Sequence, residues 1–123
     1  MYLFLDNSAD DVLIFGLSRG QAWDFTKIAQ PQELLAALED FLIKKKIKLT
    51  DLQGLAVRIG TGRFTGTRVA VTLANSLAYA LKIKVAGVRT ADLRPAVGLF
   101  KKIKTGHYVS AAYSAKPHLY GQR

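Results

Sequence analysis

The chain has 123 residues, half of them apolar, and a formal net charge of +9. This length suits one domain with one hydrophobic core, and no apolar run approaches the roughly 20 residues that a transmembrane helix needs. Because the chain has no cysteine, disulfides, thiolate metal ligands and a cysteine nucleophile are excluded, and we expect a soluble cytoplasmic protein without a signal segment.

Three short β-like segments open the chain. They cover Tyr2–Asp6, Val12–Leu17 and Ala22–Lys27, and turn-prone residues separate them. This pattern predicts a three-strand antiparallel meander. We expect Asp6 to cap the turn that follows it, and Trp23, the single tryptophan, to anchor its strand against the core or at an edge.

A first helix is predicted over Pro31–Lys45. Pro31 suits a first helical turn, and the apolar residues that follow have the spacing of one helix face: Leu34, Leu35, Leu38, Phe41 and Leu42. The lysines at positions 44, 45 and 46 fall in the last turn, where cations suit the negative end of the helix dipole.

Residues 54–88 predict a βαβ unit. An apolar strand, Gly54–Ile59, is followed by a glycine-rich turn, a helix over Thr65–Leu81 and a further strand, Lys84–Val88. The two strands should be parallel and joined by a right-handed crossover. A later helical stretch, Ala91–Ile103, is interrupted by a proline and a glycine.

The glycine-rich turn has two interpretations. Backbone amides before a helix can hold a phosphate, helped here by Arg63 and Arg68. However, the glycines at 60, 62 and 66 are spaced one residue wider than the dinucleotide fingerprint, and no Walker A lysine follows. The glycines can equally supply positive φ angles for a tight turn without a ligand.

The second helix has apolar residues on two sides. Val69, Leu73, Leu77 and Ala80 line one side, whereas Val71, Ala74 and Ala78 line another. A helix at the surface of a two-layer domain buries only one side. The other side is therefore expected to meet a helix, either in this chain or in a partner, and the small alanines allow a close approach.

At the glycine-rich turn the sequence resembles the TsaB family, also called YeaZ, which takes part in making threonylcarbamoyladenosine on tRNA. Residues 60–68, GTGRFTGTR, agree with the family pattern GPGSFTGLR at six of nine positions. The resemblance covers residues 1–93 and includes the segments around Asp51–Val57 and Ile83–Val88. At helix one the family has HSExLL, and only Leu34 and Leu35 of that motif are present here.

The family has two actin-like lobes, and this chain is long enough for the first. The resemblance implies a single RNase H-like (ASKHA) α/β lobe with a mixed sheet over residues 1–104. Residues 105–123 would form a tail that packs back on the lobe. Tyr113–Pro117 loosely resembles the last residues of the family; if these segments correspond, the second lobe was lost, and the sequence leaves that question open.

The resemblance also implies a function without catalysis, cofactor or metal. Family members scaffold and activate a TsaD-like catalytic subunit, onto which they dock through their first two helices. A TsaE-like ATPase is a further partner, and tRNA is contacted through the complex. Alone, the chain is expected to form a homodimer through the same two helices. The expected interface residues are Leu34, Leu38, Phe41, Arg68, Val71, Ala74, Asn75 and Ala78, and the expected motif residues are Gly60, Gly62, Phe64, Thr65, Gly66 and Arg68.

Two other classes of function stay open. An RNase H-like nuclease would hold two magnesium ions with Asp6 and further carboxylates, but after Asp51 the only acidic residue is Asp92. A small RNA-binding module would use the basic second half, where residues 61–123 have a net charge of +10. Its candidate residues are Lys101, Lys102, Lys104 and Lys116 with Tyr108, Tyr113 and Tyr120. Neither His107 nor His118 has a partner at metal-ligand spacing.

Overall fold

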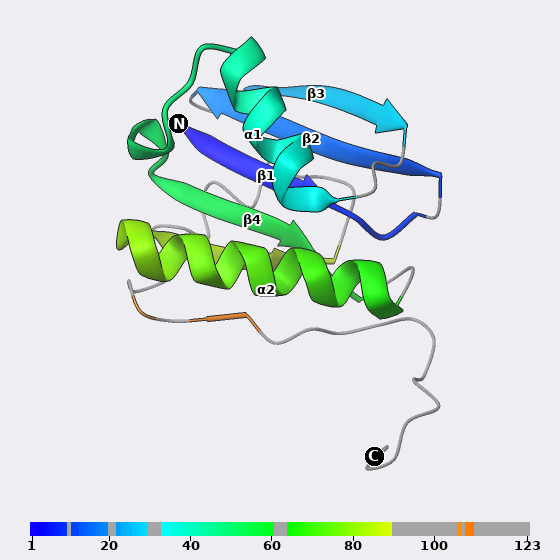
Figure 1. Ribbon diagram of the computed structural model, residues 1–123. Helices are drawn as coiled ribbons and strands as arrows, with labels where there is room; N and C mark the ends of the chain where they lie inside the picture. The colour runs from blue at the N-terminus through cyan, green and yellow to red at the C-terminus, as the bar shows by residue number, and fades with distance from the viewer. Residues whose placement is uncertain are drawn as a thin grey trace.

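The computed structural model describes residues 1–9, 11–19, 22–29, 33–60, 64–89, 106 and 108–109. Five strands form one sheet in the order β3-β2-β1-β4-β5, and two α-helices lie against it (Figure 1). The elements in chain order are β1 (Tyr2–Asp6), β2 (Val12–Arg19), β3 (Ala22–Ala29), α1 (Leu34–Lys44), the 3-10 turn η1 (Leu49–Asp51), β4 (Gly54–Arg58), α2 (Phe64–Leu81) and β5 (Lys84–Val88).

The predicted meander and βαβ unit are both confirmed. Strand β2 pairs antiparallel with β1 and β3, whereas β4 pairs parallel with β1 and β5. The sheet is therefore mixed, as expected. Strands β2 and β3 each run two residues beyond their predicted ends, because their pairing continues from Arg19↔Ala22 to Val12↔Ala29. The helix predicted over Ala91–Ile103 lies outside the described residues.

Helix α1 begins later than predicted. Glu33 has an extended backbone, with φ −142°, and is the N-cap of a helix that starts at Leu34 rather than at Pro31. Neither described helix combines the length and the apolar character that crossing a bilayer requires.

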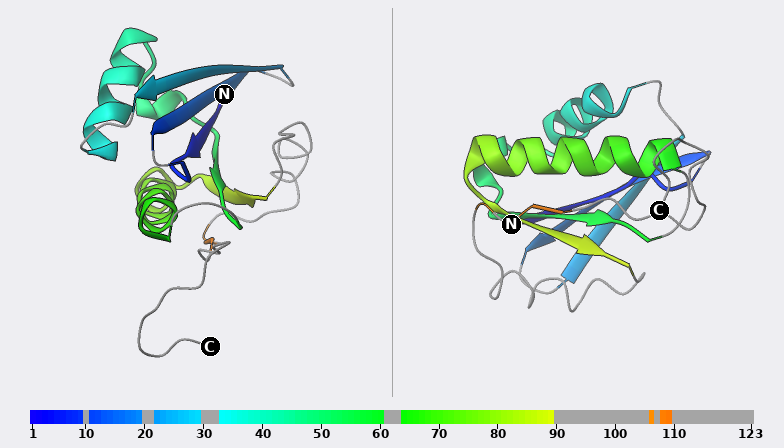
Figure 2. Two further views of the ribbon diagram at one scale, coloured as in Figure 1. Left: turned by 90° about the vertical axis from the view of Figure 1, so that its right-hand side faces the viewer. Right: turned by 90° about the horizontal axis from the view of Figure 1, so that it is seen from below.

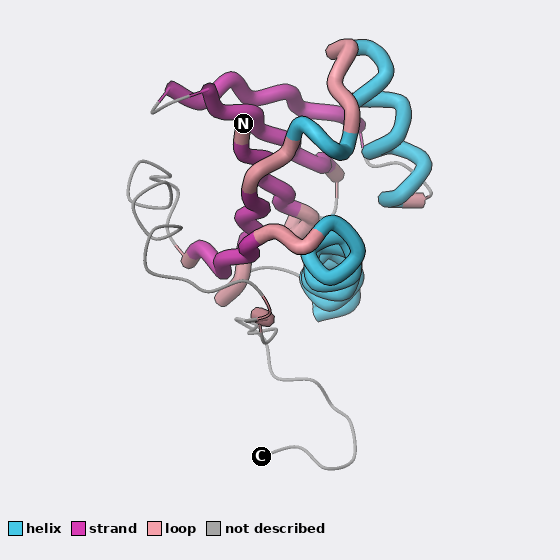
Figure 3. Tube along the Cα trace, turned by 90° about the vertical axis from the view of Figure 1, so that its left-hand side faces the viewer, coloured by secondary structure: helices cyan, strands magenta, loops and turns pink. Residues whose placement is uncertain are grey.

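Both helices cover the same face of the sheet (Figure 2). The tube in Figure 3 shows the strands on one side and the two helices on the other. Leu3 and Leu5 of β1 point into this layer, and the Phe15 ring stacks on Phe41 of α1 with 4.8 Å between centroids. The helix-side core also contains Leu13, Leu55, Val57, Val85, Ala70, Ala74 and Ala78. Burial of these apolar side chains fixes the position of both helices.

The opposite face of the sheet has a smaller apolar cluster. Phe4, Ala56, Ala86 and Val88 are buried there, and Trp23 packs partly against them. Since β3 is at one end of the strand order, the expected edge-strand anchor role of Trp23 is confirmed.

Each helix ends with a lysine in the left-handed region. Lys46 has φ 58° and Lys82 has φ 56°. The next residue in each case turns its N–H back to the helix, from Ile47 to the Leu42 carbonyl at 2.9 Å and from Ile83 to the Ala78 carbonyl at 3.1 Å. This is the Schellman pattern of a helix C-terminus, at a position that usually holds glycine.

Candidate docking site

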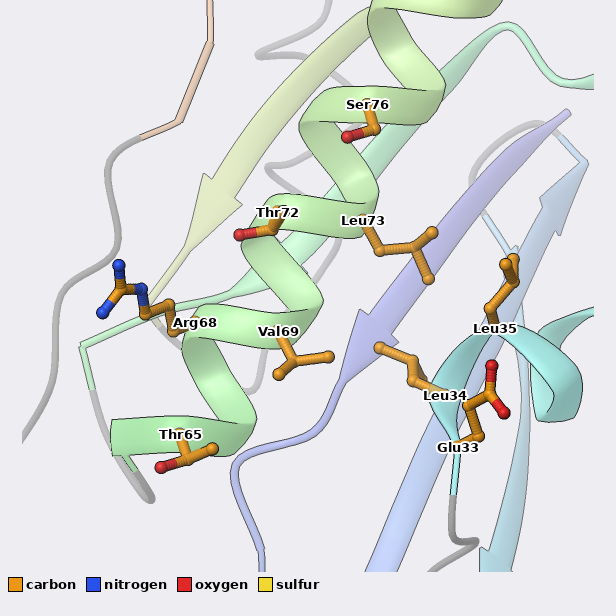
Figure 4. A pocket seen from close by; sticks show the side chains of 9 residues that line it. All are labelled: Glu33, Leu34, Leu35, Thr65, Arg68, Val69, Thr72, Leu73 and Ser76. Atoms are coloured by element: carbon orange, nitrogen blue, oxygen red, sulfur yellow. The ribbon is translucent and has the colours of Figure 1, made fainter.

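A groove runs between α1 and α2 on the outer side of the helix layer. It has a volume of about 540 Å³, and its apolar walls come from both helices (Figure 4). Leu35 of α1 is 43% exposed and Val69 of α2 is 44% exposed. The full lining consists of Glu33, Leu34, Leu35, Thr65, Arg68, Val69, Thr72, Leu73 and Ser76.

A second hollow of about 270 Å³ continues this surface along α1. Leu35 borders both hollows, and Ile43, further along the helix, is 73% exposed. The lining consists of Leu35, Leu38, Glu39, Leu42, Ile43, Ile47, Leu49 and Leu77. We call the two hollows together the helix groove.

The predicted interface residues stay a prediction: Leu34 and Leu38 line the helix groove, but most of the chosen side chains pack within this chain. Six of the chosen side chains are at most 7% exposed and belong to the core: Leu34, Leu38, Phe41, Val71, Ala74 and Ala78. The reason is the rotation of α2, which turns its alanine side toward the sheet and its Val69, Leu73 and Leu77 side toward α1. Arg68 is exposed and lines the groove, so its place at an interface stays a prediction.

Asn75, the remaining predicted interface residue, forms hydrogen bonds within its own chain. Its side-chain amide donates to the Val109 carbonyl at 2.9 Å and accepts the Val109 N–H at 3.0 Å. These bonds, with Val109 packed against the core, hold that residue of the predicted tail on the lobe.

Sequence reasoning missed Leu35 and Ile43 as exposed groove residues. They are eight positions apart, which places them on one side of a helix. Leu34, Leu38, Phe41 and Leu42 already supply the buried stripe of α1. The surplus of apolar positions on α1 was the signal that a second surface exists.

In the glycine-rich turn, the conformation of the backbone requires glycine at position 60. Gly60 has φ +84°, and a Cβ there would lie 2.8 Å from Arg89 Nη1. Gly66 is buried, and its carbonyl accepts a hydrogen bond from Asn7 Nδ2 at 3.2 Å. Thr65 is exposed and lines the helix groove. Gly62, Arg63 and the side chain of Phe64 lie outside the described residues.

Asp6 caps the turn after β1, as predicted. Its carboxylate accepts hydrogen bonds from the Ser8 N–H, at 3.0 Å, and from the Ser8 hydroxyl. The described part of the chain contains no group of three or more histidine, aspartate or glutamate side chains that could hold a metal ion. Lys101, Lys102 and Lys104, the candidate tRNA contacts, lie outside it.

Comparison with known proteins identifies the family. The family model described as TsaD, tRNA N6-adenosine threonylcarbamoyltransferase, matches residues 28–115. Among curated proteins, TsaB of Buchnera aphidicola from Schizaphis graminum is 36% identical over 61 residues, which are 50% of this chain and 29% of that protein. TsaB of Escherichia coli is 36% identical over 59 residues, which are 48% of this chain and 26% of the other.

Solved structures agree. YeaZ from Pseudomonas aeruginosa superposes with a TM-score of 0.62 and 27% sequence identity, over 72% of this chain and 43% of that protein. The matched part of this chain spans less than half the length of each of these relatives. With the match to the family model and with its TsaB and YeaZ relatives, the chain belongs to the TsaD family of that model and to the TsaB/YeaZ proteins.

Proposed function

We propose that this chain is a non-catalytic scaffold and activating subunit in tRNA threonylcarbamoyladenosine biosynthesis. It docks through the helix groove onto a TsaD-like catalytic subunit, and a TsaE-like ATPase and tRNA join the assembled complex. The pathway is supported by the relatives, which are named as threonylcarbamoyladenosine biosynthesis proteins. One observation carries the docking: Leu35 and Val69 expose nearly half of their apolar surface on opposite walls of one groove.

The helix groove has the composition of a protein interface. Its centre is apolar, with Leu35, Val69 and Leu73, whereas Arg68, Thr72 and Ser76 add polar groups along α2. An apolar centre with a polar rim is the common anatomy of such contacts. A groove between two helices accepts a partner helix that buries its own apolar stripe. The groove is therefore better suited to a helical partner than to a small polar substrate.

The carboxyl ends of the parallel strands support a role without catalysis. Ligands of open α/β sheets bind at this edge, where β1 ends with Asp6. Its carboxylate accepts two bonds from Ser8, and the Asn7 amide donates to Gly66. These hydrogen bonds stabilise the turn and the start of α2. The side chains that catalysis would need at this edge therefore have a structural role.

Binding to a purified TsaD from the same source tests the proposal. Val69→Asp and Leu35→Asp each place a charge in the apolar centre, and we expect calorimetry to show at least a tenfold weaker complex. Tyr79→Asp is the matched control, because Tyr79 lies on the same helix, is 74% exposed and does not line the groove. Equal affinity for the Val69→Asp variant and the wild type would refute docking through this groove.

A further inference from the structure

We propose that the edge of the sheet where the parallel strands begin binds the phosphate backbone of RNA. The cations of this site, called here the basic edge, are Lys46, Lys48, Lys82 and Lys84. The choice of RNA as the polyanion rests on the proposed function, because the relatives are named as tRNA threonylcarbamoyladenosine biosynthesis proteins. The site is separate from the helix groove, since none of the four lysines lines either hollow.

The topology brings these lysines to one edge. Strands β1, β4 and β5 are parallel neighbours, so their first residues lie side by side, with Tyr2 paired to Gly54 and Gly54 to Lys84. Helix α1 leads into β4 through residues 45–53, and α2 leads into β5 through residues 82–83. The segments that follow both helices therefore reach the same edge. This edge lies on the left in Figure 1 and faces the viewer in Figure 3.

The C-terminal ends of the two helices are also in contact. Leu77 of α2 lines one hollow together with Ile47, which follows α1. Ile47 belongs to the core, and Ile83 packs against the same core. Lys46 directly precedes Ile47, and Lys82 directly precedes Ile83. Each lysine is therefore one residue away from a core contact that fixes its backbone on this side of the lobe.

Few acidic residues offset the charge of this edge. Residues 44–54 and 81–84 include six lysines and one acidic residue, Asp51, which gives the two segments a formal net charge of +5. The Asp51 carboxylate accepts the backbone N–H of Lys48 at 2.9 Å. Its place is thus set by the 3-10 turn η1, and the excess of cations remains.

Two carboxylates of neighbouring elements neutralise two of the six lysines. Asp40 pairs with Lys44 at 3.0 Å, and Asp24 pairs with Lys45 at 3.8 Å. Three further lysines are exposed and form no ion pair within the described part of the chain: Lys46, Lys48 and Lys82. Clustered lysines without carboxylate partners are the electrostatic signature of a surface that binds a polyanion.

The backbone of Lys46 and Lys82 gives an independent indication. Their φ angles, 58° and 56°, lie in the left-handed region, where a helix usually ends with glycine. A Cβ is strained in this conformation, and an exposed side chain without an ion pair adds no contact that offsets the strain. Strained residues are concentrated at functional sites. Two strained lysines at one edge therefore favour a ligand that needs their charge.

The chemistry of lysine determines how the RNA is bound. An ammonium group contacts a phosphate as a point charge and does not read the bases. Binding should therefore be independent of sequence, and four such contacts should give a slope of log affinity against log salt of about −3 to −4. The predicted tRNA contacts Lys101, Lys102 and Lys104 would add to this slope, so the contribution of the basic edge is measured as a change in slope.

Titration of a labelled duplex RNA of about 20 base pairs, at about 50 to 200 mM salt, tests the site. Lys46→Gly and Lys82→Gly should each weaken binding on the order of tenfold at low salt and reduce the salt slope by about 1. Both replacements relieve backbone strain, so the loss of binding cannot be attributed to unfolding. Lys46→Arg keeps the charge and should retain the affinity.

A matched pair of variants controls for net charge. Lys48→Gln removes a charge from the basic edge, and Lys27→Gln removes one from another exposed position. Lys27 of β3 pairs with Ile14, which pairs with Asp6 at the far end of β1. We expect Lys48→Gln to weaken binding as the glycine variants do, whereas Lys27→Gln should leave the salt slope unchanged.

Three results would overturn the proposal. The first is the absence of RNA binding at low salt. The second is an equal fall of the slope in Lys27→Gln and Lys48→Gln, which would make net charge the cause. The third is tighter binding to vesicles of phosphatidylcholine and phosphatidylserine than to RNA, with loss of that binding in Lys46→Gly, which would make the edge a membrane-binding surface.

The groove variants separate this site from the docking proposal. Val69→Asp should retain RNA binding with an unchanged salt slope, and Lys46→Gly should retain its affinity for TsaD. Loss of TsaD binding with normal RNA binding would refute the docking proposal alone. If Lys46→Gly and Lys82→Gly weaken binding to TsaD and leave RNA binding intact, the basic edge is part of a protein interface and the RNA proposal is wrong.

Discussion

The side chain of Asn75 pairs with the backbone of Val109 through two hydrogen bonds, across 34 positions of the chain. The Asn75 side-chain amide thus makes the two hydrogen bonds to the Val109 backbone that a neighbouring strand would make. The Val109 side chain packs on the core beside Gly87, where an added Cβ would lie 3.1 Å from Val109 Cγ1. One polar residue of α2 therefore fixes the position of Val109 on the lobe.

Replacing Asn75 should loosen this contact and lower stability. Asn75→Leu removes both bonds and leaves the N–H and carbonyl of Val109 without these partners, which should cost about 1–3 kcal/mol of unfolding free energy. Urea denaturation measures the loss, and hydrogen exchange at the Val109 amide should accelerate. Ser76→Ala, at the adjacent exposed position, is the control. If the Val109 amide keeps its protection in Asn75→Leu, these bonds do not hold the segment.

Replacing Lys46 or Lys82, whose backbones are in the left-handed region, by glycine should raise the stability of the protein. A Cβ in this conformation is strained, and glycine relieves the strain while adding entropy to the unfolded chain. We expect Lys46→Gly and Lys82→Gly to raise the unfolding free energy by up to about 1 kcal/mol each. The urea midpoint should rise without a change in slope. A lower midpoint in both variants would mean that the lysine side chains contribute more than the strain costs.

The order of the elements could be predicted because each signal is local. Alternating apolar residues and turn residues gave the meander, and the strand, glycine turn and helix in sequence gave the parallel unit. The orientation of α2 could not be predicted in the same way. Val69 and Ala74 lie on different sides of one helix, and both sides are apolar. Which side faces the sheet depends on packing against β4 and β1, which a periodic pattern does not contain.

Polar contacts between residues far apart in the chain could not be predicted from the sequence either. Asn7 reaches the Gly66 carbonyl across 59 positions, and Asn75 was predicted as an interface residue although it binds Val109. A single asparagine gives no sign of its partner. Asp6 was predictable, since its partner Ser8 is two positions away and the turn itself has a known side-chain pattern.

Variants of Asp6 test whether its carboxylate has a structural or a catalytic role. Asp6→Asn keeps an oxygen that accepts the Ser8 N–H, so it should retain most of the stability, whereas Asp6→Ala should lose about 1 kcal/mol. We expect neither the wild type nor the variants to hydrolyse ATP or to cut RNA with magnesium. A magnesium-dependent activity that survives purification and disappears in Asp6→Asn would restore the nuclease or ATPase hypothesis.

Without a catalytic partner, the helix groove should drive self-association. The exposed Leu35, Val69 and Ile43 belong to one surface, and a twofold axis would bury this surface against its own copy. Val69→Asp should weaken the dimer at least tenfold, equal to about 1.4 kcal/mol of association free energy. Sedimentation velocity over a range of concentrations measures this change. Circular dichroism should show that the variant remains folded.

A core variant distinguishes the two sides of α2. Ala74 is 0% exposed, so Ala74→Asp buries an unpaired charge inside the lobe and should unfold the protein or cost about 3 kcal/mol or more of its stability. If instead Ala74→Asp folds normally and abolishes the dimer while Val69→Asp leaves it intact, the alanine side would be the true interface. Dimer loss in Val69→Asp with the fold retained, and unfolding in Ala74→Asp, would place the interface on the groove side of α2 and the alanine side in the core.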